Sequence, residues 1–496
     1  MGKFWIGYDI GSSSIKAALI SADDGAVVGV VQSPEKEMVI TSKAVGWGEQ
    51  DPEMWWENTC VATKKLLLQT NTNPHDVKGV GISYQMHGLV VVDKNLKALR
   101  PSIIWCDSRA VGTGNDLFKV AGQNKCIDHL LNAPGNFTLS KLKWVREHEP
   151  ELYQQIYKFM LPGDFISLKL SGECVTTASG LSEGILWDFK EGKVADWLLD
   201  SAEISPSLVS DVKETFGVQA QVNKKGAQES GLPEGIPIMY RAGDQPNNAL
   251  SLNVLQPGEI AATGGTSGVV YAVSGNTTTK EHTRINSFAH VNHTHTSPKI
   301  GKLLCINGTG IQYSWMRNQL TDNQSYNDMN AMAATVDVGS DGLRILPFGN
   351  GAERMLNNIN KGSRILNMSF TRHTKAHLFR AALEGIAFSF VYGMEILQGD
   401  GVQLSAIKAG NDNLFRAEIF SDTIATLTGC NISMVETTGA VGAARGAAYA
   451  FGDFKTFDDA VQTDEVQHTY KPQENKAPFV QAYEDWKNNL TEYINN

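Results

Sequence analysis

The sequence predicts an α/β protein built from two similar domains. Its two halves open alike, each with a strand, a turn of small residues and a second strand: 4–10 before 11–16 in the first half, 259–263 before 264–268 in the second. The two turns lie about half the chain length apart. In both halves strands are followed by helices, an order that predicts two mixed sheets with a cleft between the domains.

Length and composition support this organisation. At 496 residues, with 42% hydrophobic and 19% charged residues, the chain reads as a globular protein with more than one core. We predict a first domain at 1–242 and a second at 243–496, close to the Pro/Gly-bounded segment 233–239. The net charge of −10 supplies no basic field, so neither nucleic acid nor a membrane is an expected partner.

The cysteine pattern bears on the compartment. None of the six cysteines forms a Cys-x-x-Cys pair, which favours free thiols in a reducing environment over disulfides or a zinc site. The sequence shows no cleavable leader and no apolar stretch near 18 residues. We therefore expect a cytoplasmic protein. The sequence leaves its oligomeric state open, with a homodimer as one option.

Periodicity and turn residues predict the remaining elements. In the first half these are a strand at 26–31, a helix from Pro52 capped by Asp51, a strand at 77–83, a hairpin of 89–92 with 96–99, a further strand-like run at 103–109, two helices in 140–160 divided by Pro150, and a helix or insertion at 187–199. In the second half they are helices at 375–398, 413–429 and 440–452, and the small residues of 439–448 favour close helix packing over a ligand loop.

The two turns of small residues are the first candidate site. Successive backbone N–H groups and hydroxyls in a tight turn suit phosphate oxygens. Two such turns facing one another would clamp a polyphosphate. The sequence contains neither the P-loop string Gly-x-x-x-x-Gly-Lys-Ser/Thr nor the dinucleotide-binding string Gly-x-Gly-x-x-Gly. It therefore gives no support to either of these two phosphate-binding folds.

Two aspartates are candidates for catalysis, each with a structural alternative. Asp244 follows an apolar strand at the predicted domain junction, where its carboxylate is either a general base or a helix N-cap. Asp9 lies inside an apolar strand just before the first turn, where it either acts near Mg²⁺ and phosphates or makes a turn-stabilising hydrogen bond. Lys16 is long enough to reach a phosphate, although a hairpin lysine is usually solvated.

The third group of candidates contains the histidines and Met86, which precedes one of them. Met86 and His87 end a strand before Gly88, a geometry that points side chains into a cleft, but a lone histidine is as often structural. His290, His293 and His295 lack the spacing of a metal motif, so we do not expect them to bind a metal.

Several strings together resemble the FGGY carbohydrate kinases. They are Asp9-Ile10-Gly11-Ser12-Ser13-Ser14 with Lys16, Glu49-Gln50-Asp51-Pro52 with Trp55-Trp56, Gln85-Met86-His87-Gly88, Trp105-x-Asp107-x-Arg109, Gly243-Asp244-Gln245 and Gly264-Gly265-Thr266-Ser267-Gly268. The match is collinear over almost the whole chain. Each string alone is weak, but jointly they are specific.

The resemblance implies a fold and a set of site residues. The fold is actin-like, of ribonuclease-H type in both domains, with ATP and sugar meeting in the cleft. Asp244 is implied as the base, and Asp9 as the carboxylate near the metal, holding Mg²⁺ through water. The implied sugar contacts are Gln85, Met86, His87, Trp105, Asp107, Asp244 and Gln245. The implied nucleotide contacts are Gly11, Ser12, Ser13, Ser14, Lys16, Gly265, Thr266, Ser267, Gly310, Gly410 and Asn411.

The resemblance also implies a substrate class. Gln85-Met86-His87-Gly88 and the Trp105 string are most similar to members that phosphorylate the ketopentose D-xylulose to D-xylulose 5-phosphate with ATP. Ribulose, glycerol and gluconate stay open as alternative substrates. So does a non-catalytic actin-like regulator that binds nucleotide or sugar. The chain departs from the family at 408–413, where only one glycine of a glycine-rich nucleotide turn is present.

Overall fold

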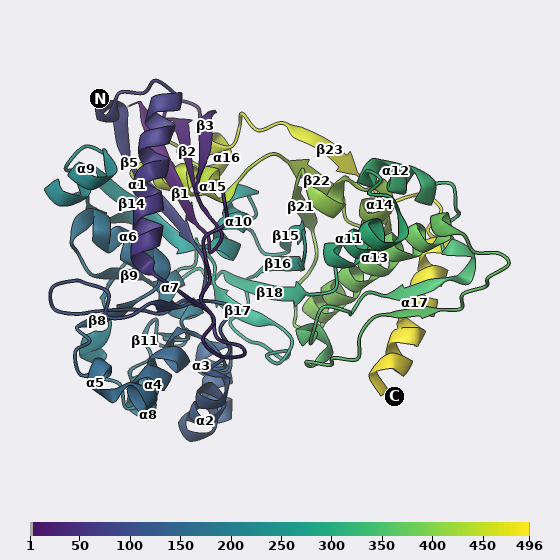
Figure 1. The fold of residues 1–496 in the computed structure, drawn as a ribbon, viewed down its shortest axis with the longest axis horizontal. Helices are drawn as coiled ribbons and strands as arrows, with labels where there is room; N and C mark the ends of the chain where they lie inside the picture. The colour runs from purple at the N-terminus through teal and green to yellow at the C-terminus, as the bar shows by residue number, and fades with distance from the viewer. Residues whose placement is uncertain (1–2, 496) are drawn as a thin grey trace.

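The computed structural model describes residues 3–495 as two α/β halves, each built on one large sheet (Figure 1). Residues 1–2 and 496, which the predicted domain ranges include, lie outside the described residues. Within 3–495 the first sheet has six strands in the order β13-β14-β5-β1-β2-β3. Their bounds are β1 Phe4–Ile10, β2 Ile15–Ser21, β3 Val27–Ser33, β5 Val77–Tyr84, β13 Phe216–Gln221 and β14 Pro237–Gly243.

The second sheet repeats the first. Over the described residues it has seven strands in the order β17-β18-β16-β15-β21-β22-β23. Their bounds are β15 Glu259–Gly264, β16 Gly268–Ser274, β17 Asn286–Ala289, β18 Ile300–Ile306, β21 Ala406–Gly410, β22 Ile432–Val435 and β23 Val466–Tyr470. In each sheet three antiparallel strands are followed by two parallel strands and one antiparallel edge strand. The predicted duplication is therefore confirmed, with β17 as an addition at one edge.

Helices cover both sheets. α1 (Pro52–Gln69) begins as predicted, because the Asp51 side chain accepts a hydrogen bond from the backbone N–H of Glu53. The other helices are α2 Val111–Ala121, α3 Gln123–Leu130, α4 Thr138–His148, α5 Pro150–Tyr153, α6 Pro162–Ser171, α7 Ala178–Glu183, α8 Asp196–Ala202, α9 Lys224–Ser230, α10 Asp244–Ser251, α11 Gly310–Leu320, α12 Tyr326–Ala333, α13 Lys375–Gly399, α14 Glu418–Thr428, α15 Gly439–Phe451, α16 Phe457–Ala460 and α17 Ala477–Asn495.

Short strands complete the structure and correct several predicted elements. They are β4 Glu49–Gln50, β6 Val90–Val92, β7 Ser102–Ile103, β8 Lys158–Met160, β9 Val175–Thr177, β10 Trp187–Asp188, β11 Lys193–Val194, β12 Asp211–Lys213, β19 Arg344–Leu346 and β20 Arg364–Leu366. The hairpin expected between 89–92 and 96–99 is present only as an antiparallel bridge of Val92 with Ala98 and a hydrogen bond of 3.0 Å from Leu99 N to Val91 O, and the strand β6 also pairs with β8. The run at 103–109 is mostly a turn after β7, and 187–199 holds the β10–β11 hairpin before α8. The helix expected at 413–429 begins only at Glu418, after a 3-10 turn.

One helix of the second half covers the first sheet. α15 packs on β1, β2, β5 and β14, and Figure 1 shows it in yellow-green beside the purple first strands. The packing is close: a Cβ at Gly7 would lie 2.0 Å from the Ala440 carbonyl oxygen, and one at Gly81 would lie 1.9 Å from that of Ala443. The prediction that this stretch packs as a helix is confirmed. α10 packs against α15, so the two helices lie side by side.

Two further expectations concern the whole chain. All six cysteines are free thiols. Across the residues that the structure describes, the helices are too short or too polar to cross a membrane.

Candidate active site

Three parallel strands of the first sheet end at one edge, and the predicted catalytic residues lie at those ends. β5 runs parallel to both β1 and β14, and Asp9 on β1 pairs with Ser83 on β5. The segment 85–87 follows β5 directly, and Asp244 follows β14 as the first residue of α10. The topology therefore brings Asp9, 85–87 and Asp244 together, as carboxyl ends of parallel strands do in α/β sites.

Asp9 lies in a partly buried position near the start of α15. Ser83 Oγ donates to Asp9 Oδ1 at 3.1 Å. A Cβ at Gly439, the first residue of α15, would lie 2.7 Å from Asp9 Oδ2, so only a glycine leaves the carboxylate its place. Burial raises the pKa of Asp9, and the Lys16 ammonium acts in the opposite direction.

Asp244 has the properties of a general base at neutral pH. Burial, and then the neighbouring Asp9 carboxylate, raise the pKa of Asp244 to about 7. A general base works best when its pKa lies near the working pH, because a large fraction is then deprotonated and the carboxylate still binds a proton readily. The Asp244 side chain makes no N-cap hydrogen bond, because Gly243 holds the cap position of α10.

His87 is held in one orientation and one protonation state. Its backbone φ is 62°, the left-handed region that non-glycine residues seldom occupy. Nδ1 lies 3.0 Å from the Glu183 carbonyl oxygen, and because that oxygen only accepts, Nδ1 carries the proton. Burial, assisted by the Lys141 charge, lowers the pKa of His87 to about 3. The neutral ring, packed against Phe137 and Phe288, therefore presents Nε2 as an acceptor.

Gln85 and Met86 are buried beside His87. Neither side-chain polar atom of Gln85 has a hydrogen-bond partner among residues 3–495, although the side chain is only 3% exposed. A buried amide without partners is costly, so its place at the end of β5 points to a ligand that supplies them. Met86 packs on Gly243, next to Asp244.

Glu183, at the end of α7, is a buried acid that sequence reasoning missed. Both carboxyl oxygens are buried, and neither has a hydrogen-bond partner within 3–495. Oε2 lies 3.8 Å from His87 Nδ1, and both oxygens face Gly243. Burial raises the pKa of Glu183 well above its ordinary value, so the neutral acid is favoured. An acid among small and apolar residues was visible in the sequence, but its neighbours come from β5 and β14.

The Glu183→Gln variant is expected to be more stable than wild type, increasingly so as pH rises. In the unfolded chain Glu183 ionises near its ordinary pKa of 4.5, whereas the folded chain keeps its proton. Wild-type stability is therefore lost between that value and the raised pKa, at up to about 1.4 kcal/mol per pH unit. Glutamine does not titrate, so the variant lacks this loss.

The measurement is chemical denaturation of both proteins at several pH values between 5 and 8. The exposed Glu474→Gln is the control and should follow the wild-type pH dependence. Parallel curves for Glu183→Gln and wild type would show that Glu183 is ionised in the folded protein.

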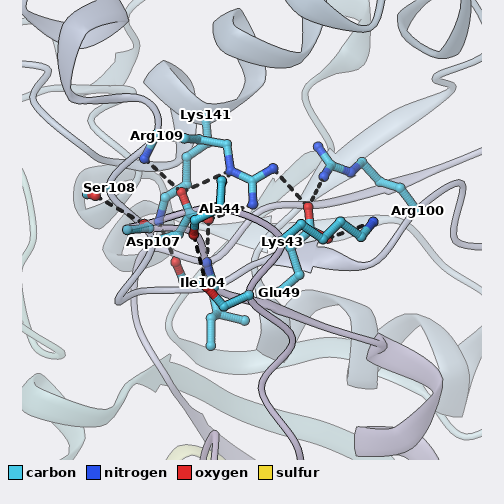
Figure 2. A network of polar contacts seen from close by, with 12 residues as sticks. Lys43, Ala44, Glu49, Arg100, Ile104, Asp107, Ser108, Arg109 and Lys141 are labelled. Atoms are coloured by element: carbon cyan, nitrogen blue, oxygen red, sulfur yellow. Dashed lines mark hydrogen bonds and ion pairs between the residues drawn. The ribbon is translucent and has the colours of Figure 1, made fainter.

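The structure gives Asp107 a different role from the one expected. It is fully buried, accepts from Gly48 N at 2.6 Å, and is paired with the Arg109 guanidinium, whose Nη2 lies 2.6 Å away. Arg109 also contacts Glu49 at 2.8 Å, and Glu49 contacts Arg100 (Figure 2). Gly48 N and Arg109 Nη2 contact Oδ2 of Asp107, and Arg109 N and Nε contact Oδ1 at 2.9 and 3.0 Å, so both oxygens of this buried carboxylate have protein partners. The assignment of Asp107 to the sugar is therefore corrected: it holds the loop that carries Trp105.

Trp105 lies at the mouth of the first turn. Its side chain is 53% exposed, and Nε1 donates to Ser12 Oγ at 3.3 Å. The turn is closed by a hydrogen bond of 3.1 Å from Gly11 N to Ser14 O, which leaves Ser13 exposed. Trp105 thus links the predicted phosphate turn with the predicted sugar segment. Gln245, next to Asp244, is partly buried.

The second turn borders a cavity of about 450 Å³. The N-terminus of α11 docks on this turn: Gly310 N donates to Gly265 O, and Ile311 N to Thr266 O, both at 3.1 Å. Residues of the turn and α11, together with residues that were not predicted, line the cavity: Gly264, Gly265, Thr266, Gly310, Ile311, Tyr313, Ser314, Tyr326, Asn327, Asn330, Asn413, Leu414, Arg416 and Ala417.

Some predicted nucleotide residues lie outside the cavity lining. Ser267 is exposed on the turn but does not line the cavity. Gly410 ends β21, and Asn411 follows it, with Asn411 N donating to Val435 O at 3.0 Å. The cavity is lined instead by residues of the segment that comes next, 413–417.

The three histidines near β17 differ in their surroundings. His290 is buried with Nδ1 3.0 Å from the Tyr271 hydroxyl, and burial lowers its pKa to about 3. His293 Nδ1 accepts from Lys299 N at 3.2 Å, whereas His295 is exposed. Within 3–495 no cluster of three or more His, Cys, Asp or Glu side chains is arranged to hold a metal ion.

Comparison with protein families agrees with this geometry. Residues 4–251 match the N-terminal domain of the FGGY family of carbohydrate kinases, and residues 260–451 match its C-terminal domain. The chain belongs to the FGGY family of carbohydrate kinases. It is therefore a sugar kinase, as its motifs predicted.

Individual relatives span the same length. A xylulose kinase of Klebsiella pneumoniae is 30% identical over 448 residues, covering 90% of this chain and 88% of the relative. A xylulose kinase of Escherichia coli (strain K12) is 28% identical over 445 residues, with the same coverage of each chain. The crystal structure of xylulose kinase from Rhodospirillum rubrum has a TM-score of 0.88 at 26% identity and covers 100% of both chains. The two-domain, actin-like fold is confirmed.

Proposed function

We propose that this kinase transfers the γ-phosphoryl group of ATP to D-xylulose, giving D-xylulose 5-phosphate. The observation that carries the proposal is the meeting, at one edge of the first sheet, of Asp244 with the unpartnered amide of Gln85 and the free Nε2 of His87. A base beside groups that can bind the sugar is what phosphorylation of a hydroxyl requires. The similarity to xylulose kinases over nine-tenths of the chain supports the choice of sugar.

In the proposed reaction Asp244 acts as the general base. Its carboxylate takes the proton of the sugar's terminal hydroxyl while that oxygen forms a bond to the γ-phosphorus. The bond from the γ-phosphorus to the bridging oxygen breaks, and ADP leaves with the electron pair. A pKa of about 7 lets Asp244 accept the proton and later release it to water.

His87 and Gln85 are proposed to bind the sugar. Nε2 of the neutral His87 accepts a hydrogen bond from one sugar hydroxyl, and the Gln85 amide both donates and accepts. Gln85 is buried and the His87 side chain is only 16% exposed, so a sugar that lacks a matching hydroxyl leaves a polar atom unpaired at a substantial cost. Trp105 and Met86 offer apolar surface for the carbon chain.

The nucleotide is proposed to lie between the two turns. Gly11, Ser12, Ser13 and Ser14 bind phosphate oxygens through backbone N–H groups and hydroxyls, with Lys16 nearby. On the other side Gly265, Thr266, Ser267 and Gly310 lead into the 450 Å³ cavity, where Tyr326 and Asn330 are placed to meet a base and ribose. Gly410 and Asn411 precede the segment 413–417, residues of which line this cavity.

The residues also fit a magnesium ion. Mg²⁺ retains waters and is held by one or two carboxylates together with substrate phosphates. Asp9 offers such a carboxylate: among residues 3–495 its side chain has a single side-chain hydrogen-bond partner, Ser83, which leaves Oδ2 available. When bound, the ion supplies neutralisation of charge on the phosphates. Asp9 and Ser83 would hold it through water.

The test is a coupled assay of ADP release with Mg-ATP and a panel of acceptors. We expect turnover with D-xylulose to exceed that with D-ribulose, L-ribulose, glycerol and gluconate by at least about tenfold in kcat/KM, a sugar-free reaction being the blank. Higher turnover on another acceptor would change the proposed substrate and leave Asp244 as the proposed base. Absence of turnover on every acceptor would contradict the proposed reaction.

A further inference from the structure

Lys141 is a fully buried lysine that contacts two segments of the proposed sugar site. It lies on α4, and its Nζ donates to the His87 carbonyl oxygen at 2.7 Å and to the Ile104 carbonyl oxygen at 3.0 Å. Figure 2 shows the side chain reaching down to the loop that holds Ile104 and Asp107. One side chain thus ties the end of β5 to the residue that precedes Trp105.

A fully buried lysine carries a cost in desolvation free energy. Burial lowers the pKa of Lys141 to about 7, because the charged form loses its hydration. Asp107, the acid that most favours the ammonium form, is already paired with Arg109, so it compensates the ammonium only in part. An ammonium group has three N–H donors and a neutral amine has two, so both carbonyls remain bound in either state. The contact therefore does not depend on one pH.

The two carbonyls belong to backbone that needs support. His87 is in the left-handed region, a conformation that costs a non-glycine residue about 1 kcal/mol or more. Its ring is fixed by the Glu183 carbonyl, and its own carbonyl is fixed by Lys141. Ile104 N donates to Gly48 O at 3.1 Å, so the second segment is held on its other side too.

We propose that Lys141 is a positioning residue for the sugar: it fixes the His87 peptide and the Trp105 loop in the geometry that binds the acceptor. The proposal rests on the proposed function, because it takes His87 and Trp105 as sugar contacts. Lys141 itself has no exposed surface, so in this proposal it acts through these two segments and not by contact with the sugar. Its loss should therefore act on sugar binding and leave the nucleotide side unchanged.

The test compares Lys141→Met with Lys302→Met. Lys302 is a matched control: it is also fully buried and also donates to a carbonyl, that of Thr278, but it lies on β18 and pairs with Asp400. For Lys141→Met we expect the sugar KM to rise about tenfold to a hundredfold, with the ATP KM within about twofold of wild type. Lys302→Met should lower the thermal midpoint without changing the sugar KM.

Two results would overturn the inference. One is a Lys141→Met enzyme with a lower thermal midpoint and an unchanged sugar KM, which would make the lysine purely structural. The other is an equal rise in the sugar and ATP KM. Should Lys141→Met fail to fold, Lys141→Gln keeps an NH2 group but is shorter and replaces part of the donor group by an acceptor oxygen. Its sugar KM should still rise at least about threefold, and an unchanged value would count against the proposal.

The assay separates this inference from the proposed function. Any acceptor that the wild-type enzyme phosphorylates serves for the comparison, including one other than D-xylulose. A wild-type enzyme inactive on every acceptor would contradict the proposed function. An active wild type with an unaltered Lys141→Met sugar KM would contradict only the role of Lys141.

Discussion

The Asp244→Asn variant is expected to lose about 10³-fold to 10⁴-fold in kcat while keeping most of its sugar affinity. Asparagine has nearly the shape of aspartate but cannot accept the proton of the attacking hydroxyl. The measurement combines ADP release with sugar binding by calorimetry. Asp116→Asn, on the exposed face of α2, is the control and should retain wild-type kcat. A variant at Asp244 that kept more than a tenth of wild-type kcat would remove Asp244 from the role of base.

The same assignment fixes a pH dependence. Since burial and Asp9 raise the pKa of Asp244 to about 7, kcat/KM for the sugar should fall about tenfold per pH unit well below 7 and level off above it. This acidic limb of the pH profile arises because the fraction of Asp244 that is deprotonated falls as the pH falls. In Asp244→Asn the residual activity should lack this limb. A wild-type profile that is flat from pH 5 to 8 would contradict the raised pKa.

The Gly81→Ala variant is expected to lose about 3 kcal/mol of stability, or to fail to fold. A Cβ at Gly81 would lie 1.9 Å from the Ala443 carbonyl oxygen and 3.2 Å from the Ala447 Cβ, so α15 cannot stay where it is. Since Gly439 of this helix faces Asp9, and Asn247 donates to the Gly439 carbonyl at 2.9 Å, activity should fall as well. The measurement is the thermal midpoint together with kcat.

Gly112→Ala is the matched control for this change. Gly112 lies on α2, and among residues 3–495 no neighbouring atom lies within 4 Å of the position that an alanine Cβ would take there. Alanine should therefore keep stability or raise it by about 0.5–1 kcal/mol through its better helix propensity. If Gly81→Ala behaved like Gly112→Ala, the close approach of α15 to the first sheet would be contradicted.

Local signals in the sequence were sufficient for the frame of the site. The strand–turn–strand openings, the Asp51 cap and the polar residues after β5 and β14 are encoded within a few residues, and each is present in the structure. Asp244 was identifiable because it follows an apolar strand directly. Its pKa could not be predicted, because that pKa depends first on burial in the folded protein and then on Asp9, which is remote in sequence.

What sequence reasoning missed depends on packing between distant segments. Glu183 and Lys141 are ordinary residues in their own helices, and only the fold buries them against His87. Asp107 shows the opposite error, since its place in a motif suggested a ligand contact while Arg109 and Gly48 take up its oxygens. The second helix predicted within 140–160 does not reach residues 158–160. These residues form the strand β8 instead, because they pair with β6, which lies far upstream in the chain.

The position of α15 sets the order in which the protein can be completed during synthesis. All six strands of the first sheet are complete once residue 243 has been added and has cleared the exit tunnel of the ribosome. The face that contains Gly7, Gly81 and Tyr240, however, gains most of its cover from residues 439–460. The nascent first half therefore holds an apolar face open until almost the whole chain exists. A protein truncated after 242 would expose the same face permanently, and such a fragment should aggregate rather than persist as a free domain.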